Sequence, residues 1–318
     1  MWIEDNVRER RYDVDCNFDG WRLDQYLANR IDGMSRSQAG RIAKGGDVEV
    51  YPRRKIKAGT RLRDGDEVVI REYLDPEFVQ DEEVEIAYED EAMMVINKPA
   101  GMLVHETASI RLNTVTHYLQ RQGLSEVHPV HRLDRETSGA LVCGRGEEAI
   151  RRLSEAFGGD GIDKTYRALV IDEEKRWGPG DEATLERSLG FEAFSPLPHK
   201  VWDGDKRALT HVSYRGEGRC RAHGHRLVDL EVRIETGRQH QIRVHLAMEE
   251  TPIAGDKLYA ESDEFFMAIC DRPDDEDLRS RMCFDTHSLH AWRVGLDHPR
   301  REERVVVETG LPTRFSEL

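Results

Sequence analysis

Residues 228–234, Val-Asp-Leu-Glu-Val-Arg-Ile, alternate apolar and charged side chains without a break. Because side chains along a β-strand point to opposite faces in turn, this pattern predicts a strand with one buried and one wet face. Apolar runs at Met93–Ile96 and Gly139–Cys143 predict further strands, whereas residues 149–157 place apolar side chains on one helical face. Such a mixture, with strands adjacent in sequence, favours an α+β fold class built on a largely antiparallel sheet flanked by helices and loops.

The first part of the chain has a different pattern. Apolar residues recur at helical spacing from Leu23 to Ile31, and residues 35–38 (Ser-Arg-Ser-Gln) form a capping box that predicts the start of a second helix. Gly45-Gly46 is expected to end that helix. Val48–Val50 and Val68–Ile70 then predict short strands, so this part of the chain is expected to be a small α/β module.

Charge also separates this module from the rest. Between Gly20 and Glu72 there are 12 Lys or Arg and 8 Asp or Glu, a net charge of +4, although the whole chain carries −15. The negative total argues against non-specific coating of nucleic acid. A basic module on an acidic body is expected of a targeted RNA binder, with chance fluctuation in a charge-rich chain as the alternative. The acidic, proline-containing stretch 73–83 indicates a linker, so we expect domains at residues 13–72 and 84–318.

The pattern of cysteines predicts no metal site, and the hydropathy of the chain predicts no membrane-spanning segment. The five cysteines are scattered without a CxxC pair, and the grouping of Cys220, His223 and His225 is interpreted as polar surface residues near a turn because no fourth ligand is apparent. The acidic segment Asp271–Asp277 is expected to be a solvated surface loop. No apolar run approaches the roughly 18 residues that span a bilayer, and the start lacks a signal pattern, so we expect no membrane partner and a cytoplasmic location.

The chemically most informative segment is residues 131–139, His-Arg-Leu-Asp-Arg-Glu-Thr-Ser-Gly, which precede a predicted buried strand. A loop at the end of a strand presents side chains from a rigid scaffold. Asp134 has an arginine close by on either side, and nearby cations favour the ionised carboxylate that a nucleophile or base must be. On the residues alone, a surface ion-pair cluster is at least as good an interpretation.

HRLDRETSGALV resembles the catalytic motif of the RluA-type family of ribosomal and transfer RNA pseudouridine synthases. Other stretches agree in order and spacing: Val95–His105 resembles the family's first motif, Lys164–Ala168 its K-x-Y-x-A strand, and Leu230–Leu246, which contains GRQHQIRVH, its last core motif. Residues 22–50 resemble the S-four-type (alpha-L) RNA-binding module. The resemblance covers nearly the whole chain and implies a pseudouridine synthase core behind an N-terminal RNA-binding domain.

The resemblance implies that the N-glycosidic bond of a uridine in RNA is broken and the base reattached through ring carbon five, with no cofactor or metal. It carries the catalytic role to Asp134, whose carboxylate can attack the ribose, add to the uracil ring or remove a ribose proton; the sequence does not choose. Arg243 is implied as the ion-pair partner of Asp134, with phosphate binding as the alternative. Tyr166 is implied as the active-site tyrosine, with an ordinary core tyrosine as the alternative.

RNA contacts are expected in both parts of the chain. The residues expected to make them are Arg36, Arg41 and Lys44 in the module, and Arg132, Arg238 and His240 in the core. The three module residues lie on the predicted second helix, where they can follow phosphates, with a solvated helix face as the alternative. Arg132 matches a residue that fills the gap left by a flipped nucleotide.

The sequence therefore predicts an RNA pseudouridine synthase that acts as a monomer, with large-subunit rRNA as the favoured partner and tRNA as the second choice. A non-catalytic RNA-binding or ribosome-assembly factor is the alternative from another class, but it would not need Asp134, Tyr166 and Arg243. A nucleoside or glycan hydrolase is a third reading, and it lacks the expected second catalytic carboxylate.

Overall fold

A computed structural model describes residues 2–3, 6–31, 34–73, 76–80, 83–107, 109–159, 161–192, 195–197 and 200–317. The chain forms two compact units, one ending at Val79 and the other starting at Gln80. The first unit is longer than the predicted module of residues 13–72, because a strand at Val7–Asp13 joins its sheet.

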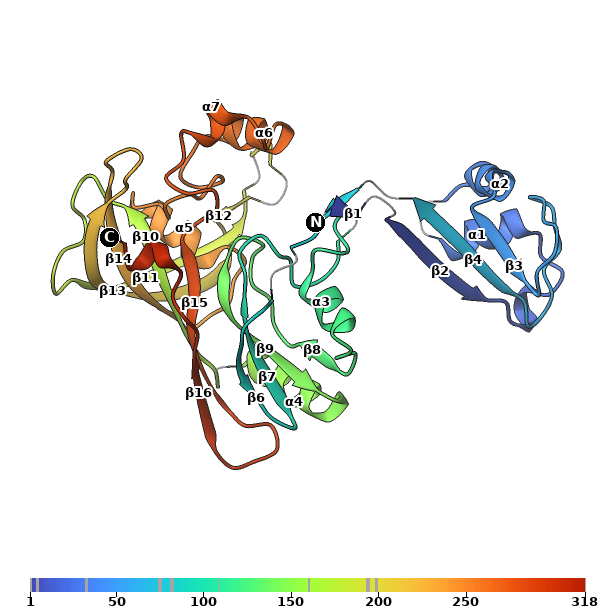
Figure 1. Cartoon of the computed structure of the whole chain (residues 1–318), viewed down its shortest axis with the longest axis horizontal. Helices are drawn as coiled ribbons and strands as arrows, with labels where there is room; N and C mark the ends of the chain where they lie inside the picture. Colours follow the sequence, from blue (N-terminus) through green and yellow to red (C-terminus); the bar gives the residue numbers. More distant parts are fainter. Residues whose placement is uncertain are drawn as a thin grey trace. The chain divides into compact units, whose positions relative to one another are not determined.

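The N-terminal unit is a small α/β structure (Figure 1). Its elements are β1 (Trp2–Ile3), β2 (Val7–Asp13), α1 (Leu23–Arg30), α2 (Arg36–Gly45), β3 (Val48–Tyr51), β4 (Glu67–Tyr73) and β5 (Glu77–Phe78), with a short 3-10 helix at Cys16–Phe18. Strands β2, β4 and β3 form an antiparallel sheet in that order, and the apolar faces of both helices pack with it in one core. The capping box forms as expected: the Gln38 N–H donates to Ser35 Oγ, and the Ser35 N–H donates to the Gln38 side chain.

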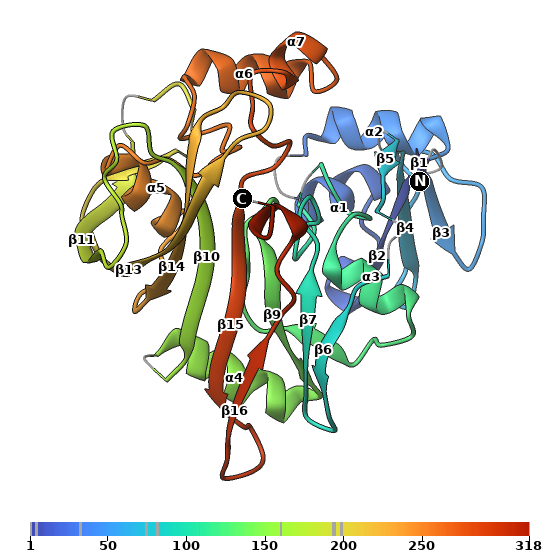
Figure 2. The same cartoon turned by 60° about the vertical axis from the view of Figure 1, so that its left-hand side comes forward.

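The second unit is built on a large, mainly antiparallel sheet, which confirms the predicted fold class (Figures 1 and 2). Its strands are β6 (Ile86–Glu89), β7 (Met93–Lys98), β8 (Val127–Pro129), β9 (Ser138–Arg145), β10 (Asp163–Ile171), β11 (Glu182–Phe191), β12 (Val201–Asp203), β13 (Lys206–Arg219), β14 (Arg226–Ile234), β15 (Leu289–Asp297) and β16 (Arg304–Glu308). Within the described residues the order is β12-β11-β13-β14-β10-β15-β9-β7-β6, with β16 beside β15 and β8 beside β9. Strands β9 and β15 pair in parallel.

The alternating segment forms most of β14. Its apolar positions, including Leu230 and Val232, are buried in a core that also contains Ile242 of the helix that follows. One charged position departs from the simple alternation: Asp229 is also buried, and it forms an ion pair with Arg167 of β10. Burying this carboxylate is tolerated because a guanidinium on the neighbouring strand compensates its charge.

Helices cover the sheet and one end of it. They are α3 (Val115–Arg121), α4 (Glu147–Gly158), α5 (Gln241–Met248), α6 (Asp263–Asp271) and α7 (Glu276–Arg279), followed near the C-terminus by a short 3-10 helix at Thr313–Phe315. Helix α4 packs on β9, and α5 packs on β11 and β13. Helices α6 and α7 lie together at one end of the sheet in both views (Figures 1 and 2).

The acidic segment Asp271–Asp277 is not the plain loop that we predicted. It runs from the last residue of α6 into α7, and Asp275 caps α7 by accepting hydrogen bonds from the N–H groups of Asp277 and Leu278. Acidic side chains are favourable at a helix N-terminus, so the same charges that indicated a solvated loop also suit a short helix. Among the described residues, no helix is both long enough and apolar enough to cross a membrane.

Candidate active site

The loop between β8 and β9 carries Asp134, and its position depends on Gly139. Strand β9 pairs with β15 at Gly139 and Ala291, and a Cβ on Gly139 would lie 2.2 Å from the Ala291 carbonyl oxygen. Gly139 also has φ of +108°, which other residues rarely adopt. The glycine of the HRLDRETSG segment therefore allows the parallel pairing that brings the Asp134 loop beside β15.

The same loop is held by hydrogen bonds at two positions after Asp134. The Lys98 ammonium is fully buried and donates to the carbonyl oxygens of Pro99, Met102 and Arg135 at 2.8, 2.8 and 3.1 Å. Two residues further along, Thr137 Oγ1 hydrogen-bonds with His287 Nε2 at 2.8 Å. These contacts fix the backbone directly after Asp134.

The structure brings Asp134 and Arg243 together although 109 positions separate them. Arg243 Nη1 of α5 donates to Asp134 Oδ2 at 2.9 Å. The other edge of the guanidinium is held by Asp256, through Nε to Oδ2 at 2.6 Å and Nη2 to Oδ1 at 2.9 Å. Among the described residues, none donates a hydrogen bond to Asp134 Oδ1.

Nearby positive charges keep the partly buried Asp134 carboxylate ionised. Burial by itself raises the pKa of Asp134, but the positive charge of Arg243 and the imidazoles of His240 and His287 outweigh it and hold the pKa below its ordinary value. Burial lowers the pKa of His240 to about 4, so this ring is neutral near pH 7. The result is a partly buried, ionised carboxylate, an arrangement that suits nucleophilic or base chemistry.

Tyr166 lies at an irregularity in the sheet. Strand β10 pairs regularly with β14 at Tyr166, but its pairing with β15 shifts register between Thr165 and Arg167. A bulge of this kind re-aims a side chain and is common next to active sites. Burial, and then the nearby Asp134 charge, raise the pKa of Tyr166, so its hydroxyl is protonated and can donate.

These side chains line one pocket of about 100 Å³. Asp134, Tyr166 and Arg243 are in its wall, together with Arg132, Arg238 and His240 from the predicted RNA contacts. Arg132 and Arg238 are exposed. His240 is half-buried, and its Nδ1 hydrogen-bonds with the Tyr259 hydroxyl at 2.8 Å. All the core residues singled out from the sequence thus converge on this pocket.

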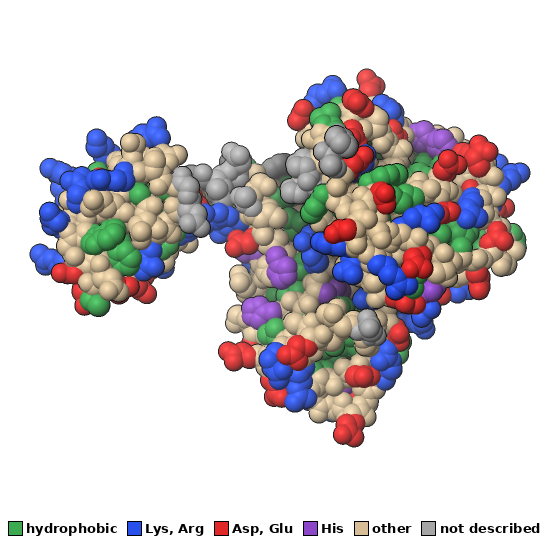
Figure 3. Space-filling view, turned by 180° about the vertical axis from the view of Figure 1, so that it is seen from behind, with side chains coloured by type: hydrophobic (Ala, Val, Ile, Leu, Met, Phe, Trp, Pro, Cys, Tyr) green, Lys and Arg blue, Asp and Glu red, His purple; other side chains and the backbone are tan. Residues whose placement is uncertain are grey.

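The module residues belong to the other unit. Arg36, Arg41 and Lys44 are all exposed on α2, and Arg36 also lies 3.6 Å from the carboxylate of Asp24. On the face drawn in Figure 3, Lys and Arg predominate on the N-terminal unit, whereas both signs of charge are interspersed over the second unit. On this face, the charge difference seen in the sequence is thus visible.

Two residues of the site carried no usable signal in the sequence. Asp256 holds Arg243, and Tyr259 places its ring 5.0 Å from the Arg243 guanidinium carbon. Asp256 follows Gly255, whose φ is +81° and whose Cβ would meet the Thr286 carbonyl oxygen at 2.5 Å. A lone Asp after a glycine is common in turns, so only its partner in space reveals its function.

Comparisons with known proteins agree with this geometry. A family model described as RNA pseudouridylate synthase matches residues 92–248. The "Ribosomal large subunit pseudouridine synthase D" of Pseudomonas aeruginosa is 31% identical, covering 96% of this chain and 93% of that protein. The protein of the same name from Vibrio cholerae is also 31% identical, and the match covers 94% of this chain and 90% of that protein.

Solved structures show the same fold. Human RNA Pseudouridylate Synthase Domain Containing 1 superposes with a TM-score of 0.58 at 23% identity, over 74% of this chain and 86% of that one. Human RNA Pseudouridylate Synthase Domain Containing 4 superposes with a TM-score of 0.52 at 23% identity, over 73% of this chain and 90% of that one. The fold and the full-length relatives define an RNA-modifying enzyme. The chain belongs to the RluA-type family of RNA pseudouridine synthases.

Proposed function

We propose that this enzyme converts specific uridines of large-subunit rRNA to pseudouridine, with Asp134 as the catalytic carboxylate. The observation that carries the proposal is the ionised Asp134, held through one oxygen by Arg243 at 2.9 Å, in a pocket that it shares with Tyr166. In this proposal the enzyme works as a monomer in the cytoplasm. Light scattering on the purified chain tests the oligomeric state.

The reaction is an isomerisation whose atoms balance without water. The bond from ribose C1′ to uracil N1 breaks, a bond from C1′ to C5 forms, the C5 proton leaves and N1 gains a proton. Asp134 Oδ1, which accepts no hydrogen bond from the described residues, faces the nucleoside and acts at the ribose or the ring. The Tyr166 ring stacks on the freed uracil, and its hydroxyl takes part in proton transfer at C5.

Reaching the base requires that the target nucleotide leave its stack. In the proposal, the exposed Arg132 guanidinium occupies the vacated position, because its planar face can stack on bases. Arg238 and His240, at the start of α5, contact the RNA beside the flipped nucleotide. The exposed guanidinium of Arg238 suits a phosphate, and the neutral imidazole of His240 suits the edge of a base.

Loss of the carboxylate tests the catalytic assignment. RNA transcribed with 5-tritiated uridine releases tritium when C5 is substituted, and chemical mapping locates the pseudouridine. We expect Asp134→Asn to lower the rate by about 10³-fold or more, while RNA affinity stays within a few-fold. Asp163→Asn, the same change at an exposed position of β10, is the matched control and should keep full activity. An active Asp134→Asn enzyme would refute the assignment, and free uracil would indicate a hydrolase.

The rRNA substrate is supported by relatives named for the large ribosomal subunit, which align along nearly the whole chain. Pseudouridine maps of cells with and without the gene test it directly. We expect one or a few large-subunit uridines to lose modification, while tRNA is unchanged. Loss confined to tRNA would show that the substrate is tRNA instead.

We also propose that the N-terminal unit is an S-four-type RNA-binding domain that uses Arg36, Arg41 and Lys44 of α2. Each phosphate contact that is removed should lower the slope of log affinity against log salt by about 0.7–0.9. The three alanine variants, measured by filter binding across a salt series, test this. Arg151→Ala, an exposed arginine of α4, provides the control for charge alone.

A further inference from the structure

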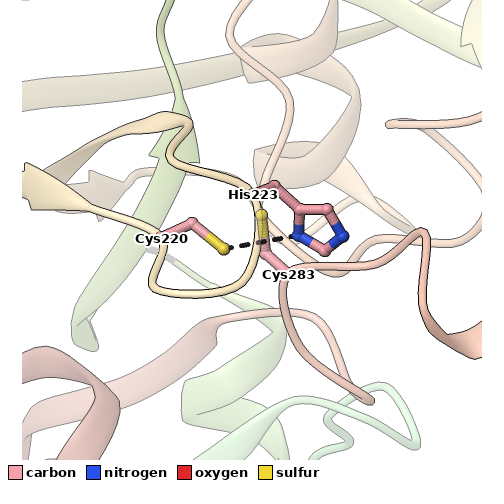
Figure 4. Close-up of side chains that lie close together, drawn as sticks. All are labelled: Cys220, His223 and Cys283. Atoms are coloured by element: carbon pink, nitrogen blue, oxygen red, sulfur yellow. Dashed lines mark hydrogen bonds between the residues drawn. The ribbon is translucent and has the colours of Figure 1, made fainter.

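The fold brings together a cysteine pair and a histidine that do not line the active-site pocket. Cys220, His223 and Cys283 place one sulfur or nitrogen atom each within 4.8 Å of one another (Figure 4). The sequence grouping of Cys220, His223 and His225 was interpreted as polar residues near a turn, because no further ligand was apparent. In the structure Cys283 takes the place of His225 in the group, whereas His225 Nδ1 hydrogen-bonds with Glu173.

We propose that Cys220, His223 and Cys283 bind a single thiophilic divalent ion, with zinc as the preferred metal. Two thiolates and an imidazole are ligands that zinc favours, and zinc with three protein ligands keeps a fourth position for water. Within the described residues no fourth His, Cys, Asp or Glu joins the group, so that position is open. The site lies in no motif of the catalytic core.

The spacing of Cys220 and His223 fits a tetrahedral ion. Zinc–sulfur bonds of about 2.3 Å and zinc–nitrogen bonds of about 2.0–2.1 Å, at tetrahedral angles, place a sulfur and a nitrogen ligand about 3.5 Å apart. The distance from Cys220 Sγ to His223 Nδ1 is 3.6 Å. These two ligands therefore need almost no movement to accept the ion.

The imidazole of His223 is already set for coordination. His223 Nε2 lies 2.5 Å from the Ser280 carbonyl oxygen, which can only accept, so Nε2 carries the proton. Nδ1 then keeps its lone pair, and Figure 4 shows this nitrogen turned toward the Cys220 sulfur. A ligand histidine whose other nitrogen donates to a carbonyl is the usual outer arrangement of a metal site.

Both segments that carry the ligands are defined locally. Cys220 lies at the end of the β13–β14 hairpin, where its N–H donates to the His225 carbonyl and Gly224, with φ of +71°, closes the turn. Cys283 lies after α7. The sulfur of Cys220 is packed among apolar neighbours that include Leu227 and Ala254, a setting that weakens competition from water.

The ion would join the hairpin to the chain that enters β15. Cys283 is four positions before His287, which hydrogen-bonds with Thr137 of the catalytic loop. The Phe284 and Thr286 carbonyls also lie against Gly255, next to Asp256. A metal at this place would therefore fix the segment that leads into β15 and, through His287, the loop that carries Asp134.

Metal content of the full-length, untagged protein tests the site. We expect one zinc per chain by elemental analysis of protein purified with a phosphine reductant. Cys220→Ser and Cys283→Ser should each lower zinc affinity at least about tenfold, because one of three ligands is lost. Cys16→Ser and Cys270→Ser, at exposed cysteines, are the matched controls and should keep one equivalent. His225→Ala should also keep it.

Cobalt absorption and thermal stability provide two independent measurements. Added Co²⁺ should give thiolate-to-metal absorption in the wild type and weaker absorption in Cys283→Ser. The melting temperature should rise with the logarithm of zinc concentration in the wild type only. If a serine variant does not fold, His223→Ala replaces it, because that side chain is exposed. Any of four results would overturn the proposal. They are wild-type protein that contains no zinc, a Cys283→Ser variant that retains it, a His225→Ala variant that loses it, and a Cys220–Cys283 disulfide in the reduced preparation.

Discussion

Replacing Asp256 by asparagine separates the positioning of Arg243 from the chemistry of Asp134. Asp256 is almost completely buried and accepts two hydrogen bonds from one edge of the Arg243 guanidinium. Asparagine has nearly the same shape, but its amide has a single acceptor oxygen. One of the two guanidinium N–H donors would therefore face an NH₂ group, and the buried negative charge would be lost.

The expected cost follows from the burial of this pair. Removing one partner of a buried ion pair costs about 3–5 kcal/mol, and we expect about 3 kcal/mol because Arg243 keeps Asp134. At about 2–4 °C per kcal/mol for a domain of this size, the melting temperature should fall by about 6–12 °C. A guanidinium that tilts by about 1 Å should lower kcat by up to about 10²-fold, because Asp134 is no longer held in one orientation.

The assay is tritium release from the RNA substrate at a temperature well below both melting points. Asp229→Asn is the matched control, because Asp229 is also buried and also pairs with an arginine, Arg167, through Nε at 3.0 Å. Neither Asp229 nor Arg167 is among the residues that line the active-site pocket. Both variants should lose stability, and Asp256→Asn alone should lose turnover. Wild-type kcat in folded Asp256→Asn would refute the positioning argument.

Three further outcomes are expected. Tyr166→Phe keeps the ring but not the hydroxyl, so kcat should fall by about 10²-fold or more with KM little changed, and a wild-type rate would exclude a role for the hydroxyl. Lys98→Met leaves three carbonyl oxygens without their donor, so the free energy of unfolding should drop by about 2 kcal/mol or more in urea titrations; an unchanged midpoint would contradict this. Burial lowers the pKa of His287 and His290 to about 4, so both bind protons on unfolding below their ordinary pKa of 6.5. The free energy of unfolding should therefore be highest above about pH 6.5 and decrease toward pH 4, by up to about 1.4 kcal/mol per pH unit for each histidine. A free energy of unfolding that does not change with pH in this range would contradict the expectation.

The amino-acid sequence by itself determined the local elements and the class of enzyme. Alternation in residues 228–234 predicted β14, and the capping box at Ser35 predicted the start of α2, because both signals depend on neighbours within a few positions. The HRLDRETSG segment and its companion motifs indicated the pseudouridine synthase family. Local charge was a weaker guide, since the acidic stretch taken as a loop includes the start of α7.

Apart from the Asp134–Arg243 pair, which the family resemblance implied, only the tertiary structure decided which side chains meet. Arg243 of α5, a helix that packs on β11 and β13, lies between Asp134 and Asp256, and its bond to Asp134 joins residues more than a hundred positions apart. Cys283 likewise joins Cys220, 63 positions along the chain. Such pairings arise from sheet order and packing of the whole core, and no short window of sequence contains both partners. The chemical groups can therefore be read along the chain, but their geometry belongs to the fold.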